Sequence, residues 1–327
     1  MPTEVGDWAS SRRFCVTGGR GLLGSRVVDL LASLGAAEVV AFDAVASTAP
    51  GRNPRVRDME GSVLDREALR SAVEECDTVF HLAALTDVGE SQDQLDRFFG
   101  VNAWGTARVG QACRSARVHR VVYSSTSHVY GTPEELPIRE EHPLRPQSPY
   151  AASKVAGEAA MWGFAMSADG SADILRLANL YDARSRTTTL VGRMLSAVLR
   201  GEGIRIKSFR PVRDFVPAEE AAEAFVRVAA LPGASGECRV ANVSSSEPCS
   251  VGDVARTLAE IARDFGLGDF VPEETGGADP STEDEIVLDG RRLYTRLDWL
   301  PTMTLETGLR RCLMDRLGHG HEGARGS

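Results

Sequence analysis

The chain has 327 residues, 43% of them hydrophobic and 25% charged, and its 37 Lys and Arg against 46 Asp and Glu give a formal charge of −9. This acidic balance argues against nucleic acid or an anionic membrane surface as the main partner. No stretch approaches the ~20 apolar residues of a transmembrane helix, and the N-terminal MPTEVGDWASSRR lacks the apolar core of a signal peptide. We therefore expect a globular, cytoplasmic protein.

The first two thirds of the chain alternate short apolar runs with stretches of helical periodicity. In chain order we predict strand FCVTGG, helix LLGSRVVDLLASLG, strand EVVAFDA, helix LDREALRSAVEEC and strand TVFHLAA. Next come a helix over 102–116, a strand over 120–127, a helix that opens with SPYAASK and a strand over 173–179. Such alternation is typical of a parallel sheet covered on both faces, so the sequence predicts a Rossmann-like doubly wound α/β fold.

After Asn179 the strict alternation breaks, as expected for a smaller α/β domain that binds substrate. Further helices are predicted near 190–200, over 251–264 and near 304–316. We place the cofactor-binding domain at 11–178 plus about 214–242, the substrate-binding domain at 179–213 and 243–317, and a disordered Gly-rich tail at 318–327.

The six cysteines lie at scattered spacings without a CxxC pair. This pattern argues against both a zinc site and a disulfide framework, and it is typical of a reducing compartment. The two histidines of the tail sit in a segment expected to be frayed. We therefore predict no metal site.

A glycine-rich loop follows the first strand. Gly18, Gly21 and Gly24 lie between that strand and the next helix, where glycines allow a tight turn and the approach of a pyrophosphate to the helix N-terminus. Asp43 ends the second strand, where a carboxylate can hold the adenosine ribose hydroxyls and repel a 2′-phosphate. Arg20 within the loop pulls mildly the other way, but nothing basic follows Asp43 directly. The sequence therefore favours NAD over NADP.

SPYAASK (148–154) places a tyrosine four residues before a lysine at the start of a helix, so Tyr150 and Lys154 share a face. A tyrosine acts as a base near neutral pH only if its pKa of about 10 is lowered, and a neighbouring ammonium is the direct way to lower it. SSTSHVYG supplies hydroxyl groups at the end of a parallel strand, where such sheets bind ligands. We take Thr126 as the residue that orients the reacting hydroxyl.

Together, TGGRGLLG, HLAA, VNAWGT, SSTSHVYG, SPYAASK, LRLANLY and RDFVPAEEAAEA resemble the motifs of the extended short-chain dehydrogenases. The resemblance is to their NAD-dependent nucleotide-sugar epimerase and dehydratase group and spans roughly residues 13–315. It implies that Tyr150 deprotonates the sugar 4-hydroxyl, that Lys154 tunes Tyr150 and holds the nicotinamide ribose, and that Thr126 bonds the same hydroxyl. Hydride would leave carbon 4 for NAD.

The resemblance also implies two sets of contacts. Those to NAD are Gly18, Gly21, Leu22, Leu23, Gly24, Asp43, Ser62, Val63, Leu82, Ala83, Ala84, Asn102, Ser124, Tyr150 and Lys154. Those to a nucleotide-sugar substrate, with UDP-sugar favoured, are Thr126, Ser127, Asn179, Arg184, Arg213 and Arg292. By analogy with the same family we expect a homodimer.

Some positions depart from the family pattern. Dehydratases carry Asp-Glu after the catalytic threonine and sugar-nucleotide decarboxylases resemble STSEVYG, whereas this chain has Ser127 and His128. Dehydration is therefore disfavoured, and His128 is either a catalytic proton carrier or a residue of the pocket rim. The usual glycine after Asn-x-Tyr is Asp182, a GDG turn is replaced by SFRPV, and an adenine-contacting acid is replaced by Ser62. We expect the first two to alter the substrate pocket.

Several functions stay open at this stage. The leading hypothesis is an NAD-dependent enzyme that oxidises carbon 4 of a UDP-sugar and then decarboxylates the product or returns the hydride to the other face. A reductase of 4-keto sugars is the alternative among enzymes. A catalytically silent dinucleotide sensor on the same fold is the third hypothesis, because a fold alone does not establish activity.

Overall fold

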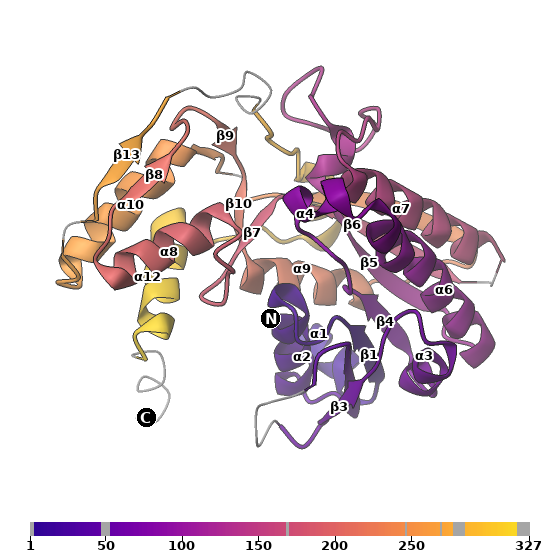
Figure 1. The fold of residues 1–327 in the computed structure, drawn as a ribbon. Coiled ribbons are helices and arrows are strands. Elements are labelled where there is room, and N and C mark those ends of the chain that lie inside the picture. Colours follow the sequence, from indigo (N-terminus) through magenta and orange to yellow (C-terminus); the bar gives the residue numbers. More distant parts are fainter. Residues whose placement is uncertain are drawn as a thin grey trace.

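A seven-stranded, all-parallel sheet forms the centre of the computed structural model, which describes residues 3–46, 53–167, 170–245, 247–268, 270–276 and 285–318. The strand order is β11-β6-β5-β4-β1-β2-β3 (Figure 1). The strands are β1 (Arg13–Thr17), β2 (Glu38–Asp43), β3 (Val56–Glu60), β4 (Thr78–His81), β5 (Arg120–Thr126), β6 (Ser171–Leu177) and β11 (Glu237–Val243). The chain winds outward from β1 in both directions, which confirms the predicted Rossmann-like doubly wound fold.

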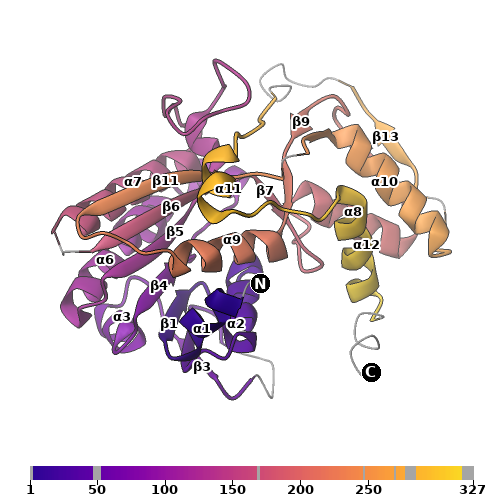
Figure 2. The same cartoon turned by 180° about the vertical axis from the view of Figure 1, so that it is seen from behind.

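Helices cover both faces of this sheet (Figures 1 and 2). One face carries α1 (Thr3–Ser10), α2 (Leu22–Ser33), α9 (Ala218–Ala230) and α11 (Arg291–Leu297). The other carries α3 (Arg66–Val73), α6 (Gly105–Ala116) and α7 (Pro149–Ser167). Because both faces are covered, the central strands read as nearly continuous apolar runs rather than as alternating ones.

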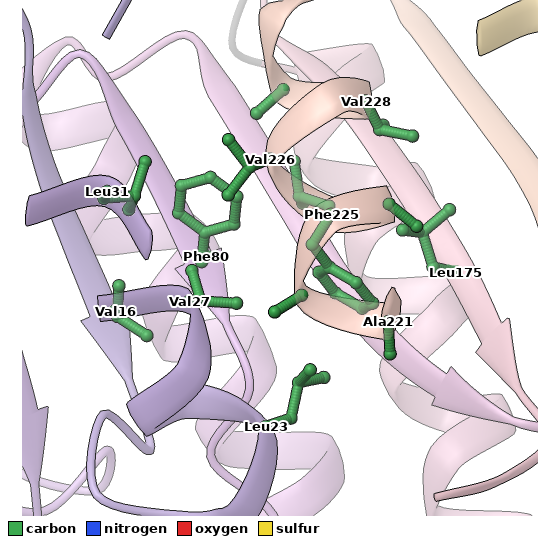
Figure 3. Close-up of a cluster of buried hydrophobic side chains, with 14 of the residues drawn as sticks. Val16, Leu23, Val27, Leu31, Phe80, Leu175, Ala221, Phe225, Val226 and Val228 are labelled. Carbon is green, nitrogen blue, oxygen red and sulfur yellow. The ribbon is translucent and has the colours of Figure 1, made fainter. Parts of the chain in front are cut away.

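Figure 3 shows how the first of these layers packs. Val27 and Leu31 of α2 face Phe225 and Val226 of α9, and Phe80 of β4 reaches up between the two helices. All five side chains are fully buried. This packing fixes α2, the helix that follows the glycine-rich loop, on one face of the sheet.

A second group of elements lies beside the sheet, on the left in Figure 1, and has its own apolar cluster. Its helices are α8 (Leu190–Arg200), α10 (Val251–Asp264) and α12 (Leu305–Arg316). Its short strands pair as β7 (Asn179–Tyr181) with β10 (Phe215–Pro217), β9 (Val212–Arg213) with β12 (Cys249–Ser250), and β8 (Ile204–Ile206) with β13 (Pro272–Glu274). The three helices confirm the predicted ones. The predicted domain boundaries stay a prediction, and all of the predicted tail except Gly318 lies outside the described residues.

The segment between β4 and α6 differs most from its prediction. Short helices α4 (Val88–Asp93) and α5 (Leu95–Phe98) lead into a π-helical turn, η1 (Phe99–Trp104), where the predicted helix was to begin. A π-helical turn shifts the hydrogen-bond ladder by one residue, which periodicity alone does not reveal. Among the described residues, no helix combines the length and apolar character needed to cross a membrane.

Candidate active site

The glycine-rich loop turns tightly between β1 and α2 and lies against the end of β4. Gly18 has φ +70°, and a Cβ built on it would stand 2.7 Å from the backbone nitrogen of Ala83. A Cβ on Gly24 would stand 1.9 Å from the carbonyl oxygen of Gly18. Side chains at these positions would therefore displace backbone, and the N-terminus of α2, with Leu22 and Leu23 as its first residues, stays open to a pyrophosphate.

Asp43 ends β2 beside this loop. Its two carboxylate oxygens accept the backbone N–H groups of Arg20 at 3.0 Å and of Val45 at 3.1 Å. Each oxygen keeps acceptor capacity for a ribose hydroxyl. The guanidinium of Arg20 pairs with Asp58 at 3.0 Å and also bonds the carbonyl of Val45, so its charge is already engaged. This arrangement fits a dinucleotide without a 2′-phosphate.

The other predicted cofactor residues lie at the carboxyl ends of neighbouring strands or support them. Leu82, Ala83 and Ala84 follow β4, and Ser124 lies on β5. Ser62 and Val63 follow β3, where the Ser62 hydroxyl accepts the N–H of Leu64 at 3.1 Å and Val63 is buried. Their contacts to NAD stay predictions.

Asn102 is fully buried in η1. Its amide oxygen accepts the N–H of Leu85 at 2.8 Å, while its amide nitrogen donates to the Leu85 carbonyl at 2.9 Å and to the Ser153 hydroxyl at 3.0 Å. Asn102 thus joins the loop after β4 to α7. In this geometry it positions the site, and its predicted contact with the cofactor stays a prediction.

Tyr150 and Lys154 lie on the first turns of α7, and Thr126 ends β5 opposite them. All three are buried. The Thr126 side chain is hydrogen-bonded to Tyr150, and the Lys154 ammonium nitrogen lies 4.3 Å from the centroid of the Tyr123 ring. The structure therefore brings together the three residues that the sequence analysis selected.

The electrostatics of this group correct one expectation. Burial raises the pKa of Tyr150, and the hydrogen bond with Thr126 offsets only part of that rise. Burial also lowers the pKa of Lys154 to about 7. The predicted lowering of the Tyr150 pKa is thus wrong in this structure, because desolvation of the phenol outweighs the hydrogen bond with Thr126.

His128 lies against Tyr150. Its ring meets the Tyr150 ring edge to face, with 5.9 Å between the centroids. Burial, helped by the positive charge of Arg213, lowers the pKa of His128, so the imidazole is neutral at neutral pH. Ser127 beside it is buried. His128 therefore contacts the Tyr150 ring and lies near enough to Arg213 for that charge to act on it.

Of the remaining predicted substrate residues, Asn179 stays close to this centre and the two others do not. Asn179 opens β7, and its N–H donates to the carbonyl of Asp214, the residue after Arg213. Arg184 pairs with Asp182, and Arg292 pairs with Glu140 at 3.4 Å in a surface hollow of about 550 Å³. This hollow is lined by Arg139, Glu140, Glu141, Asp289, Arg291, Arg292, Thr295 and Arg296, none of which belongs to the group around Tyr150. Phosphate binding by Arg184 and Arg292 stays a prediction.

Asp182 links the two groups of elements. It is buried and accepts a hydrogen bond at 2.7 Å from the guanidinium of Arg26 on α2. Arg26 also reaches Glu219 on α9 at 3.3 Å and Asp315 on α12 at 3.9 Å. The expectation that Asp182 alters the substrate pocket stays a prediction. Its carboxylate joins the helix after the glycine loop to the second group of elements.

A buried polar network behind α7 was not predicted from the sequence. Glu158 accepts a hydrogen bond from the Ser125 hydroxyl at 2.5 Å and forms a bidentate pair with Arg176 of β6 at 2.7 and 2.9 Å. Arg176 also donates to the Tyr130 hydroxyl at 3.0 Å. The available signal was the position of Glu158, four residues after Lys154 on the same helix. Within the described ranges, no three His, Cys, Asp or Glu side chains gather as a metal site would require.

Comparisons with known proteins agree with this geometry. Residues 14–244 match the model of the NAD dependent epimerase/dehydratase family. A UDP-glucose 4-epimerase from Streptomyces lividans is 30% identical over 316 residues, covering 89% of this chain and 92% of that protein. A dTDP-glucose 4,6-dehydratase from Streptomyces griseus is 29% identical, with 90% of each chain covered.

Solved structures give the same picture. MoeE5 in complex with UDP-glucose and NAD has a TM-score of 0.82 at 29% identity, covering 94% of this chain and 99% of MoeE5. The complex of MoeE5 with UDP-glucuronic acid and NAD has a TM-score of 0.80 at 29% identity, covering 91% and 96% of the two chains.

Proposed function

Because the chain belongs to the NAD-dependent epimerase/dehydratase family of extended short-chain dehydrogenases, we propose that it inverts carbon 4 of a UDP-linked hexose or hexuronic acid. Its cofactor is NAD, which accepts the hydride from carbon 4 when bound. The observation that carries the proposal is the composition of the group around the Tyr150 phenol. Thr126, His128 and Phe98 lie against Tyr150, and none of the three is a carboxylic acid.

In the proposed reaction, Tyr150 takes the proton of the sugar 4-hydroxyl and later returns it. The Thr126 side chain, hydrogen-bonded to Tyr150, holds that hydroxyl in line. Lys154 in its ammonium form favours the phenolate of Tyr150. Arg213 and Asn179 are proposed to bind the diphosphate, because a guanidinium fork suits phosphate oxygens. Inversion then needs only that the 4-keto sugar rotate in the site, so that the hydride returns to the opposite face of carbon 4.

Dehydration requires acid and base groups that the residues around Tyr150 do not provide. It requires a base for the carbon-5 proton and an acid for the leaving hydroxyl, and Ser127 and His128 stand where family dehydratases carry Asp-Glu. A buried hydroxyl and a neutral imidazole do not replace two carboxyl groups. We therefore do not assign dehydratase activity to this chain.

Decarboxylation of a UDP-glucuronate is the second candidate. A 4-keto sugar with a carboxylate on carbon 5 is a β-keto acid, which loses carbon dioxide without a base. The observation in favour is that Arg213 lies close enough to His128 to influence its pKa, and the His128 ring contacts the Tyr150 ring. A guanidinium there fits a substrate carboxylate as well as a phosphate.

A proton NMR time course with NAD and, separately, UDP-glucose and UDP-glucuronic acid tests the proposal. We expect the anomeric and carbon-4 signals of the 4-epimer to appear, with the carboxylate retained in the second reaction. A UDP-pentose would establish the second candidate instead. Net consumption of NADH with a 4-keto sugar would indicate a reductase, and unchanged spectra with both UDP-sugars and with the 4-keto sugar would favour the dinucleotide sensor.

We also propose that the chain forms a homodimer through α6 and α7. Large apolar side chains are exposed on this side of the sheet domain: Trp104 at 57%, Trp162 at 44% and Met166 at 60%. Such side chains on neighbouring helices are typical of a covered surface. Light scattering on a size-exclusion column should give twice the chain mass, and Trp162→Glu should give a monomer.

A matched control for the dimer is Leu300→Glu. Leu300 is as exposed as Met166 but precedes α12, away from α6 and α7. This variant should remain dimeric. A monomeric wild-type chain, or a dimer that survives Trp162→Glu, would contradict the proposed interface.

A further inference from the structure

We infer that Glu158 is a positioning residue that keeps Lys154 in its ammonium form, a role that rests on the function proposed for Lys154 above. Both residues lie on α7 at a spacing of four, so their side chains leave the same face of the helix. Glu158 is buried, and its carboxylate is fixed from two sides by Ser125 of β5 and Arg176 of β6. Its charge is therefore held at a constant place beside the lysine.

The need for such a partner follows from the burial of Lys154. A buried lysine tends to lose its proton, and burial lowers the pKa of Lys154 to about 7. Of the two members of the Glu158–Arg176 ion pair, it is Glu158 whose charge acts on Lys154, and it raises the lysine pKa. Arg176 lies on the far side, where it is also 4.9 Å from the centroid of the Tyr130 ring.

Among the described residues, no other charged group facing Lys154 offsets the desolvation of its ammonium. The titratable groups facing it are Tyr150 and Glu158 on α7, Tyr123 on β5 and His81 on β4. Burial raises the pKa values of both tyrosines, so both are neutral phenols. Burial lowers the pKa of His81 to about 3, so this imidazole is neutral as well. Glu158 is thus the negative charge that offsets the desolvation of Lys154.

The same network reaches the substrate side of the site. Ser125, which donates to Glu158, directly precedes Thr126, and Thr126 is hydrogen-bonded to Tyr150. One buried carboxylate therefore supports both the strand end that orients the substrate hydroxyl and the lysine that tunes the base. A change at Glu158 should alter the protonation of Lys154 without removing any group that contacts substrate.

The composition of the chain allows this protonation to be measured directly. Lys154 and Lys207 are its two lysines, and Lys207 is exposed. Protein labelled with ¹³C at the lysine ε-carbon therefore gives two signals, which Lys207→Arg assigns. We expect the Lys154 signal of NAD-saturated protein to titrate about one pH unit lower in Glu158→Gln, because removal of an opposite charge disfavours the ammonium. The Lys207 signal should not move.

Two further variants make the result decisive. Glu158→Gln leaves Arg176 buried without its partner, so Glu158→Gln/Arg176→Gln provides the same measurement should the single variant fail to fold. Asp173→Asn removes another buried carboxylate of the sheet, one that pairs with Arg120 at 2.5 Å and Arg296 at 2.7 Å. It should leave the Lys154 midpoint unchanged.

An unchanged Lys154 midpoint in the folded Glu158 variants would overturn the inference. So would a shift of equal size in Asp173→Asn, because the effect would then follow from the loss of any buried carboxylate. In turnover, the alkaline limb of the kcat/KM profile should move to lower pH in Glu158→Gln, whereas a purely structural defect would lower the rate equally at all pH values. The NMR titration needs no substrate, so a failure of the proposed epimerase reaction leaves this test readable.

Discussion

Tyr150→Phe is expected to lower kcat for carbon-4 inversion by about 10³-fold, the size of effect that a positioned proton carrier contributes. The variant removes one oxygen atom from a buried ring and leaves Lys154, Thr126 and the glycine-rich loop in place. Its affinity for NAD, measured by fluorescence titration, should therefore stay within about twofold of wild type, or ~0.4 kcal/mol, because the loop predicted to bind the pyrophosphate is unchanged. Steady-state assays with UDP-glucose and its 4-epimer give the rate.

Tyr181→Phe is the matched control for this variant. Tyr181 is also buried, and its hydroxyl has no hydrogen-bond partner among the described residues. Loss of that hydroxyl should change neither the rate nor the NAD affinity. Near-normal turnover by Tyr150→Phe would contradict the proposed mechanism. A loss of NAD affinity equal to the loss of rate would assign Tyr150 to cofactor binding instead.

The sequence predicted the parts of the fold whose apolar pattern is set locally. The buried strands β1, β4 and β5 read as apolar runs, and α10 lies where its periodicity placed it. Strand β3, with the sequence VRDME, escaped prediction because it is an edge strand paired only with β2 and largely exposed. Helix α1 has only eight residues and depends on tertiary contact, since Trp8 packs 5.2 Å from the Phe14 ring.

In the candidate site, too, some residues had places that the sequence could predict and others did not. Tyr150, Lys154 and Thr126 were predictable because a helical spacing and a strand end fix their relative places. Arg184 and Arg292 were not, because the partner of a long guanidinium side chain is chosen by tertiary packing, here Asp182 and Glu140. The pKa values of the site residues could not be predicted from the sequence either. They follow from burial, and burial is a property of the folded chain.

The pairing of Glu158 with Arg176 illustrates what the sequence alone cannot predict. The spacing of Glu158 from Lys154 is visible in the sequence, yet a glutamate four residues from a lysine on a helix is usually an exposed pair of small energy. Only the fold shows that this glutamate is buried and held by a strand residue 18 positions farther along. The functional meaning of the pattern thus depends on burial, not on spacing.

Gly24→Ala is expected to weaken NAD binding by about 10- to 100-fold, corresponding to the ~1–3 kcal/mol that overpacking costs. Helix propensity alone predicts the opposite, because alanine stabilises a helix interior by ~1 kcal/mol relative to glycine. Here the added Cβ would stand 1.9 Å from the Gly18 carbonyl oxygen, a backbone atom that cannot rotate away. The loop must therefore open and withdraw its N–H groups from the pyrophosphate. Isothermal titration calorimetry with NAD measures the loss.

Gly163→Ala provides the matched control, because Gly163 is also helical but a Cβ there meets nothing within 4 Å. That variant should bind NAD as wild type does. It should melt at an equal or slightly higher temperature, since the substitution changes only the helix propensity of the residue. Unchanged NAD affinity in Gly24→Ala would mean that the loop tolerates a wider turn than its geometry implies. The close approach of Gly24 to Gly18 would then serve the packing of α2 on β1 rather than the cofactor.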